Sequence, residues 1–366
     1  MRPLRLLAAV TGSPRLLGAG PVAAATPVRV PPDSLSGASG TAPAPDRPGA
    51  RARLRAWAEL LRVSALFTVP GDALAGAAAA GRRPGRGTAL AVGASLCLYE
   101  AGMALNDWAD REEDAVDRPH RPIPSGRVAP GAALAAAGAL TAAGLALAAR
   151  AGRPALAVAS GLAATVWAYD LHLKHTKLGP AAMASARTLD LLLGATASAA
   201  TATTMTAARS ATGGRPVTAR ARSAALPAAL ALGAHTYAVT AVSRHEAQGG
   251  STAAPLAALA GVAGLAAAVL RGRPAPGEPP RTPAAAERIL LPAFAAAYLR
   301  TSAVPLLHAA LNPSPPLTQR AVGGGIRAMI PLQAALAARA GAPLVGLAAM
   351  GLVPLARALS RKVSPT

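Results

Sequence analysis

The sequence predicts an all-α membrane protein, a polytopic bundle of about nine transmembrane helices. Of its 366 residues, 52% are hydrophobic and only 14% are charged, whereas a soluble domain needs about a quarter or more of its surface charged. Uncharged runs of the ~20 residues that cross a bilayer recur along the chain. These runs are rich in Ala and Gly, which membrane helices use at close contacts. A soluble Ala-rich helical protein is the alternative.

The N-terminal part differs from the rest in composition. Residues 1–55 are rich in Pro, Gly, Ser and Arg without helical periodicity, which predicts a disordered arm. Residues 56–360 then form the membrane domain. Basic residues ahead of the first span favour a cytoplasmic N-terminus, and the ends of even-numbered spans then face the cytoplasm. The Arg groups after the first and fifth spans do not follow this rule.

Nine or ten spans are predicted, each from an apolar run that contains few or no charges. In chain order they are Leu66–Ala80, Gly87–Leu105, Val128–Ala149, Pro154–Tyr169, Leu191–Ala208, Ser223–Ser243, Ala247–Leu270, Ile289–Ala310, Ile326–Ala338 and Ala340–Ala356.

The net charge of +21 comes from 37 basic residues, nearly all of them arginines. They lie mostly between the spans, with no stacking aromatics among them, so anchoring to lipid headgroups explains them better than nucleic acid does. The single Cys97 lies in an apolar run. It supports neither a disulfide framework nor a thiolate metal site.

Acidic residues concentrate at the end of the second span. The cluster contains Asp107, Asp110, Glu112, Glu113, Asp114 and Asp117. If the helix continues, the four aspartates share one stripe and the two glutamates point elsewhere. Such a stripe needs a cation among its carboxylates, and oxygen ligands of this kind suit Mg²⁺ bridging to substrate phosphates. A solvated helix end is the alternative, and Asn106, one of two Asn residues in the chain, argues against it.

A loop rich in Pro and Arg follows at once, from Arg118 to Arg127. Its prolines end the helix and stiffen the chain, while guanidinium groups donate forked hydrogen bonds to phosphate oxygens. We expect Arg118 or Arg121 to lie over the metal site. An ordinary loop at the membrane boundary is the alternative.

The pattern Asn106-Asp107-x-x-Asp110-x-x-x-Asp114 followed by Arg-Pro-x-Arg-Pro-Ile-Pro-Ser-Gly resembles the first aspartate motif and adjoining loop of the UbiA family of membrane prenyltransferases. The resemblance implies a bundle around a central cavity, with its active site at the cytoplasmic side of the cell membrane. It also implies that Asp107, Asp110 and Asp114 bind Mg²⁺, with Asn106 beside them.

The end of the fourth span carries a second signal. Two of the chain's three lysines lie there, and Lys174 is an ammonium suited to phosphate, although boundary anchoring would also explain it. The segment resembles the Tyr-x-x-x-Lys loop of the same family, which implies roles for Tyr169 and Lys174. In the next helix, Arg187 and Asp190 share a face, either as a structural ion pair or as substrate contacts.

The family's second aspartate motif belongs at the end of the sixth span, where this chain departs from the pattern. Tyr237 and Arg244 stand as expected, but Glu246 is the one acid there. The fourth span ends in Tyr-Asp-x-x-Leu-Lys-His-Thr, and a Gly-Gly-Ser run follows Glu246. With these two features the chain looks most like the EboC-like branch of the UbiA family.

The resemblance implies an enzyme that ionises a prenyl diphosphate with Mg²⁺ and transfers the isoprenoid to a small acceptor, for example an aromatic one. The Asp-Gly-x-x-Ala-Arg start of phosphoalcohol transferases is absent. The depleted second motif leaves another alternative open, a catalytically impaired relative that binds or helps to move an isoprenoid or other amphiphile.

Overall fold

The computed structural model describes residues 49–206, 217–271, 284–351 and 354, and every regular element within them is helical. One compact unit extends from Pro48 onward. The predicted arm falls largely on residues 1–48, outside the described part. Its last residues are not disordered, because helix α1 (Ala50–Leu60) begins within it. Ala56 and Leu60 of α1 are buried beside α3 and α5 while the α1 arginines are exposed, and this amphipathic pattern explains the correction.

Seven described helices are long and apolar enough to cross a membrane, which confirms the all-α membrane prediction. They are α3 (Arg86–Ala109), α5 (Pro130–Ala151), α6 (Arg153–Ala168) together with the π-helical turn η2 (Tyr169–Leu173) that continues it, α8 (Val217–Ser243), α9 (Ala253–Leu270), α10 (Ala285–Leu311) and α11 (Pro315–Arg339). Two further apolar elements lie among them, the shorter α2 (Pro70–Ala79), which follows the 3₁₀ turn η1 (Val63–Thr68), and α7 (Gly179–Thr206). The exact number of spans stays a prediction.

Most predicted spans differ from the structure at one or both ends, and α11, for example, begins at Pro315 rather than at Ile326. Helix α7 begins at Gly179 rather than Leu191, because the charges of Arg187 and Asp190 interrupt the apolar run while lying inside the bundle. Of the last predicted span, residues 343–351 are helical, and residues 352, 353, 355 and 356 lie outside the described part.

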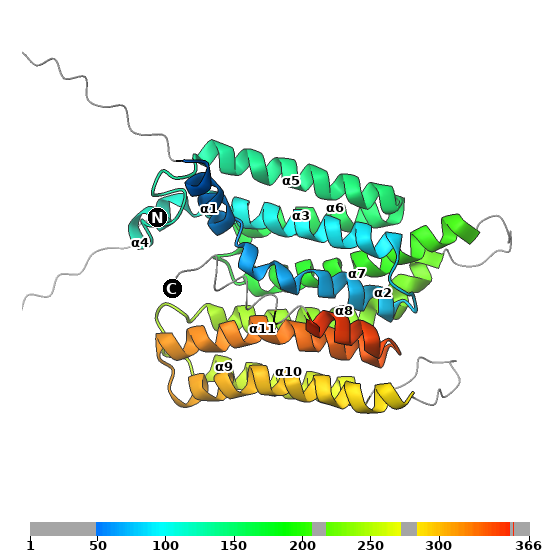
Figure 1. The fold of residues 1–366 in the computed structure, drawn as a ribbon. Helices are drawn as coiled ribbons and strands as arrows, with labels where there is room; N and C mark the ends of the chain where they lie inside the picture. Colours follow the sequence, from blue (N-terminus) through cyan, green and yellow to red (C-terminus); the bar gives the residue numbers. More distant parts are fainter. Residues whose placement is uncertain (1–48, 207–216, 272–283, 352–353, 355–366) are drawn as a thin grey trace, which may run out of the picture. The chain divides into compact units, whose positions relative to one another are not determined.

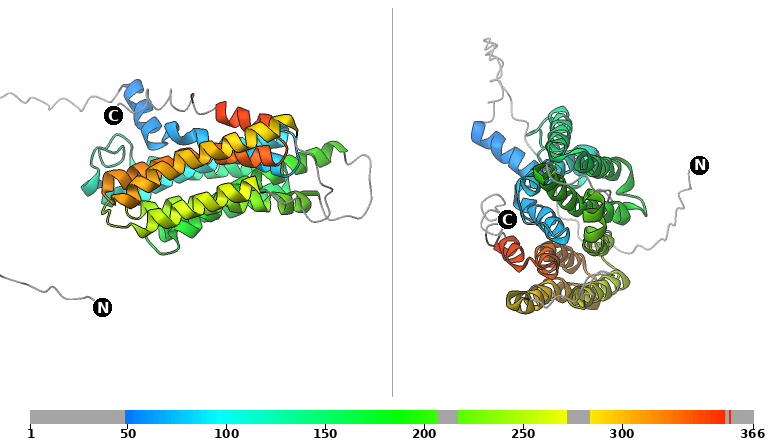
Figure 2. Two further views of the ribbon diagram at one scale, coloured as in Figure 1. Left: turned by 90° about the horizontal axis from the view of Figure 1, so that it is seen from below. Right: turned by 90° about the vertical axis from the view of Figure 1, so that its right-hand side faces the viewer.

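Helix α7 connects the two sides of the bundle (Figures 1 and 2). It packs against α2, α3 and α6 and, on its other side, against α8, while α8 in turn packs against α9 and α11. Gly76, Gly87 and Gly194 face backbone atoms across these contacts, with no room for a side chain. Close helix packing through small residues, as predicted from the composition, is therefore present.

The C-terminal ends of α3, α6 and α8 meet at one end of the bundle, as expected for even-numbered spans. There Gly250 N donates to the Pro313 carbonyl at 2.7 Å, joining the α8–α9 and α10–α11 loops. Gly249 has a φ of 65°, and a Cβ at that position would lie 2.5 Å from the same carbonyl oxygen. The Gly-Gly pair thus allows the loops to approach closely beside the predicted site.

Candidate active site

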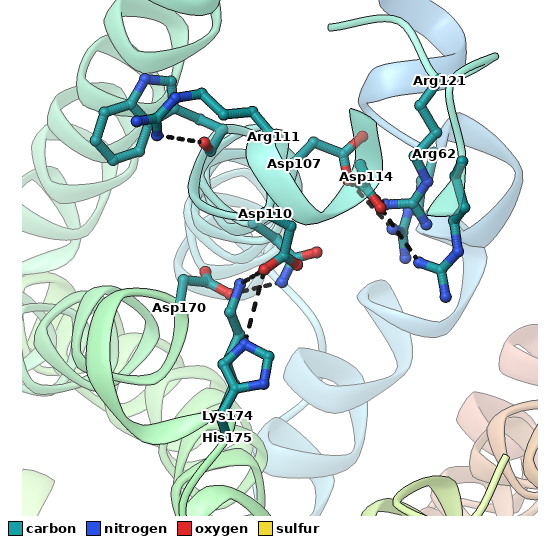
Figure 3. Close-up of polar contacts among 12 residues, drawn as sticks. Arg62, Asp107, Asp110, Arg111, Asp114, Arg121, Asp170, Lys174 and His175 are labelled. Atoms are coloured by element: carbon teal, nitrogen blue, oxygen red, sulfur yellow. Dashed lines mark hydrogen bonds and ion pairs between the residues drawn. The ribbon is translucent and has the colours of Figure 1, made fainter. Parts of the chain in front are cut away.

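The acidic segment does not form one continuous helix. Helix α3 ends at Ala109, Asp110 adopts a φ of −87° and a ψ of 3°, and the short α4 (Arg111–Asp117) begins after it. The prediction of a single stripe is therefore wrong. The break turns Asp107 and Asp114 toward one group of side chains and Asp110 toward another (Figure 3). Asp117 is exposed.

Asp107 and Asp114 face arginines. Both carboxylates are buried, with 5% and 2% of their surface exposed, and the Arg121 guanidinium bridges them at 3.4 Å and 2.7 Å. Arg118 contacts Asp114 at 3.5 Å, and Arg62 contacts Asp107 at 3.3 Å. We name these five residues the arginine cluster. Charge-assisted contacts of this kind lower the cost of burying the two carboxylates.

Sequence reasoning missed Arg62, which precedes the first predicted span. Its φ of 47° and ψ of 46° lie in the left-handed region, a conformation that costs a non-glycine residue about 1–3 kcal/mol and often marks functional sites. Its position in an irregular turn between α1 and η1 left no periodic signal in the sequence.

The loop that carries Arg118 and Arg121 is held against α1. Arg127 donates to both carboxylate oxygens of Glu59, at 2.6 Å and 3.1 Å, and this hydrogen bonding raises the pKa of Arg127 above its usual value. Ile123 and Val128 are buried in the apolar cluster around Leu60. The arginines of this loop are thus positioned by packing, in addition to the stiffening predicted from its prolines.

Asp110 faces the end of the fourth span. After α6 the chain forms a π-helical turn, η2 (Tyr169–Leu173), a feature often found at functional sites. This turn brings the Lys174 ammonium into an ion pair with Asp110, with 10% of the lysine side chain exposed. Tyr169 is half-buried in the same turn. The expected placement of Lys174 on the side of the first motif is confirmed.

Asp170 is the clearest residue that sequence reasoning missed. It is 4% exposed and accepts a hydrogen bond from Asn106 Nδ2 at 3.1 Å. This contact ties the first motif to η2 and explains the placement of the rare Asn. In the sequence Asp170 is visible only as an acid directly after Tyr169, and an ordinary residue at the end of a helix would look the same.

A cavity of ≈ 370 Å³ opens beside Asp110. Its lining includes Asp110, Glu113, Asp170, Lys174 and His175. Ligand atoms of Asp110, Glu113 and His175 lie within 4.8 Å of one another. The expectation that Glu113 points away from the site is therefore wrong, because Glu113 is three residues after Asp110 and lies on the same side of the helix.

Arg111 takes no part in the arginine cluster. Its guanidinium lies 4.7 Å from the centre of the Trp108 ring and 3.0 Å from Glu112. The Arg111 guanidinium group thus already has its partners on the outside of α4.

The end of α8, the sixth predicted span, reaches the same end of the bundle, and we name residues 237–251 the helix-six segment. Arg244 donates to the Thr176 carbonyl, which links the end of α8 to the loop after η2. Partial burial raises the pKa of the Glu246 carboxyl, and the Arg118 charge opposes that shift. Glu246 is thereby placed near the arginine cluster. Tyr237 differs, since its side chain on α8 is 48% exposed.

Arg187 and Asp190 lie deeper in the bundle, in one polar network. Arg187 pairs with Asp72 of α2 at 2.5 Å, and Asp190 accepts a hydrogen bond from Ser95 of α3. Gln333 of α11 donates to Asp72 at 2.6 Å. The ion pair of Arg187 is thus made across helices, and the network ties α2, α3, α7 and α11 together.

Comparison with known proteins places this geometry in a family. The model of the UbiA prenyltransferase family matches residues 65–272. Digeranylgeranylglyceryl phosphate synthase of Methanopyrus kandleri is 38% identical over 130 residues, which are 34% of this chain and 46% of that protein. The synthase of the same name from Ignicoccus hospitalis is 32% identical over 151 residues, 41% of this chain and 50% of that protein. The chain thus spans about half the length of these relatives.

Solved structures agree in fold. A UbiA homologue from Aeropyrum pernix has a TM-score of 0.55 at 16% identity, covering 79% of this chain and 98% of that one. A UbiA homologue from Archaeoglobus fulgidus, bound to GPP and Mg²⁺, has a TM-score of 0.53 at 16% identity, covering 81% and 99%. The closer resemblance to the EboC-like branch stays a prediction. The family match over more than half of the chain, together with the shared fold, shows that this protein belongs to the UbiA prenyltransferase family.

Proposed function

We propose that this chain ionises a prenyl diphosphate at the end of the bundle where α3, η2 and α8 meet, and transfers the isoprenoid to a small acceptor. The observation that carries the proposal is the arrangement of charge on the two sides of the break at Asp110. Asp110, Glu113 and Asp170 line the cavity with Lys174 on one side, and arginines surround the Asp107 and Asp114 carboxylates on the other. A diphosphate with its divalent cations needs both kinds of surface.

The donor set fits Mg²⁺. Aspartate oxygens are hard ligands, and Mg²⁺ is usually held by one or two carboxylates plus substrate phosphates. We propose Asp107, Asp110 and Asp114 as the ligands on the protein. Bound there, Mg²⁺ would neutralise the charge that grows on the departing diphosphate.

The chain's own cations have a separate role. Arg121 is shared between Asp107 and Asp114, and Lys174 is paired with Asp110. A diphosphate competes for such donors, so we propose that Arg121, Arg118 and Lys174 exchange carboxylate partners for phosphate oxygens when the donor binds. The exchange frees the aspartates for the metal at the moment the substrate arrives. Arg244, Glu246 and Tyr169 are proposed to complete the polar end of the site.

The rest of the bundle suits the isoprenoid. Its buried residues are mostly Ala and Leu, and an apolar surrounding protects an allylic cation from water. The relatives named above are prenyl-transferring synthases by name, and the Archaeoglobus homologue was solved with GPP, which supports a prenyl diphosphate donor. The basic N-terminal segment favours an active site that faces the cytoplasm.

The test is diphosphate release. Purified protein in detergent is incubated with Mg²⁺, prenyl diphosphates of several lengths and candidate acceptors, and released diphosphate and prenylated product are measured. Asp110→Asn is expected to abolish release, and Glu112→Gln, an exposed acid whose oxygen is paired with Arg111, is the matched control. The absence of release with every donor that binds would overturn the proposal.

A binding protein without turnover is the second candidate. The helix-six segment favours it, because one acid stands where the family pattern has an aspartate motif. In that case prenyl diphosphates bind with Mg²⁺ dependence, no diphosphate is released, and Glu246→Gln leaves affinity nearly unchanged.

A further inference from the structure

Three arginines lie within the membrane-spanning parts of α10 and α11, away from the candidate active site. Arg327 is the central residue of the 25-residue α11, Arg320 precedes it by one heptad, and Arg300 lies near the middle of the 27-residue α10. All three are exposed, and we name them the intramembrane arginines. At 1.5 Å per residue, Arg327 and Arg300 are roughly 18 Å and 17 Å from the helix ends at the α10–α11 loop. Both are thus near the centre of a hydrocarbon core about 30 Å thick.

The intramembrane arginines occupy neighbouring positions on this helix pair. Residues one heptad apart differ by only about 20° around a helix, so Arg320 and Arg327 share one stripe of α11. Gly324 packs on α10, where its Cβ would lie 3.0 Å from the Thr301 carbonyl oxygen, and this contact places Arg300 at a depth between the other two. Helices α8 and α9 pack against α11 and α10 respectively, so the exposed faces of the pair are turned away from them (Figures 1 and 2).

The chain supplies no negative charge to this face. The intramembrane arginines have no ion pair or hydrogen bond to any other residue that the structure describes. Helices α10 and α11 contain one acid, Glu287, in the first turn of α10 at the opposite end of the bundle. An unpaired cation in the hydrocarbon is costly, and like charges repel one another. The set therefore requires an anion from outside the chain.

The side chain of Arg327 indicates where that anion belongs. Long helical side chains lean toward the N-terminus of their helix, and the Arg327 guanidinium lies over Gly323, with Nη1 3.3 Å from the position that a Cβ would take there. Gly323 lies between Arg327 and Arg320 on the same stripe. The two guanidinium groups thus converge over a residue without a side chain, which leaves room for an anion between them.

We propose that this face binds the phosphate headgroup of an anionic lipid between Arg320 and Arg327, with Arg300 adding positive charge beside it. Guanidinium groups donate forked hydrogen bonds that match phosphate oxygens. Arg320 is roughly 8 Å from the start of α11, so its long side chain reaches the headgroup layer at that end of the bundle. A lipid of that leaflet can therefore enter the site along the α11 stripe.

A lipid fits this face better than a protein does. Exposed apolar side chains of the same two helices are available to its acyl chains, namely Val304, Leu307 and Ile326, which are 48%, 44% and 41% exposed. A second copy of the chain would bring the same three cations to the contact and no exposed acid from either helix. The inference is independent of the proposed function, because none of these residues belongs to the candidate active site.

The probes are phosphatidylglycerol, which is anionic, and phosphatidylcholine with the same acyl chains, which is zwitterionic. Purified full-length protein in a non-ionic detergent is titrated with each lipid, and bound lipid is counted by native mass spectrometry. Replacing both Arg320→Gln and Arg327→Gln should lower the affinity for phosphatidylglycerol by about tenfold or more and leave that for phosphatidylcholine unchanged. Arg300→Gln alone should have a smaller effect in the same direction.

A matched control separates this site from the general positive charge of the chain. Arg86→Gln with Arg288→Gln removes two exposed arginines from the first turns of α3 and α10, at the other end of the bundle. This pair should leave the tightest phosphatidylglycerol site unchanged. All the replaced side chains are exposed, so each variant should elute from size-exclusion chromatography as the wild type does.

Four results would overturn the inference. They are an equal loss of phosphatidylglycerol in the two double variants, equal retention of the two lipids by the wild type, displacement of the lipid by an equal concentration of glycerol phosphate, and dimers that the Arg320 and Arg327 substitutions dissociate. Binding of a Leu-rich transmembrane peptide with one central Glu, dependent on Arg327 and without binding of phosphatidylglycerol, would assign the face to a protein partner instead.

The outcome is separable from that of the proposed function. Loss of the lipid from the Arg320 and Arg327 double variant should leave the affinity for a prenyl diphosphate unchanged. A protein that releases no diphosphate but retains the lipid through these two arginines would refute the transferase and leave the lipid site standing.

Discussion

Arg121 provides the sharpest test of how the two buried aspartates are held. Its guanidinium contacts Asp107 at 3.4 Å and Asp114 at 2.7 Å, with 20% of the arginine side chain exposed. Removing one partner of a buried ion pair costs about 3–5 kcal/mol. Arg62 and Arg118 remain beside the carboxylates in the variant. We therefore expect Arg121→Gln to lower the free energy of unfolding by about 2–3 kcal/mol, below the full cost of an unpaired charge.

The assay is unfolding in detergent, with and without Mg²⁺. Because Arg121→Gln removes the cation that competes for Asp107 and Asp114, Mg²⁺ alone should stabilise this variant more than the wild type. Affinity for a prenyl diphosphate should nevertheless fall by at least tenfold, or about 1.4 kcal/mol, because a phosphate partner is lost.

Arg127→Gln is the matched control from the same loop. Its ion pair with Glu59 is 39% and 43% exposed, so its loss should cost at most about 1 kcal/mol and leave the response to Mg²⁺ unchanged. Equal losses for the two variants, or an Arg121→Gln protein that gains no extra stability from Mg²⁺, would refute the exchange of partners proposed for the arginine cluster.

Three further predictions follow from single positions. Asp110→Asn should weaken the Mg²⁺-dependent binding of a prenyl diphosphate at least tenfold, or about 1.4 kcal/mol. Glu112→Gln should change this affinity little, and both are measured by calorimetry. Equal effects of the two substitutions would mean that the general acidity of the segment binds the donor, and not a shaped site. Gly249→Ala places a Cβ against a carbonyl at positive φ and should cost about 1–3 kcal/mol in unfolding experiments, more than Gly250→Ala, whose Cβ meets open space. Glu100→Met should raise the free energy of unfolding by about 1–3 kcal/mol, because it removes two carboxylate oxygens that are buried without a hydrogen-bond partner among the described residues; a lower thermal midpoint would show that the carboxylate is needed.

The sequence by itself determined the class of protein and the location of its candidate site. Bilayer-length apolar runs require helices because backbone groups in lipid must pair within their own segment, and this constraint acts locally along the chain. The Asn106–Asp114 motif, the arginine loop and Lys174 were likewise identifiable from spacing, since each is contained in a short segment. That the ends of even-numbered spans meet followed from alternation across the bilayer.

The partners of each charge depended on the tertiary structure. A single irregular residue, Asp110, turns α4 and separates its own carboxylate from those of Asp107 and Asp114, and no propensity in the sequence marks that break. Arg62, Asp170 and His175 reach the site from distant elements, so their roles depend on how α1, α3 and η2 pack. Periodicity describes one helix at a time, whereas electrostatic contacts form wherever the packed helices bring charges together.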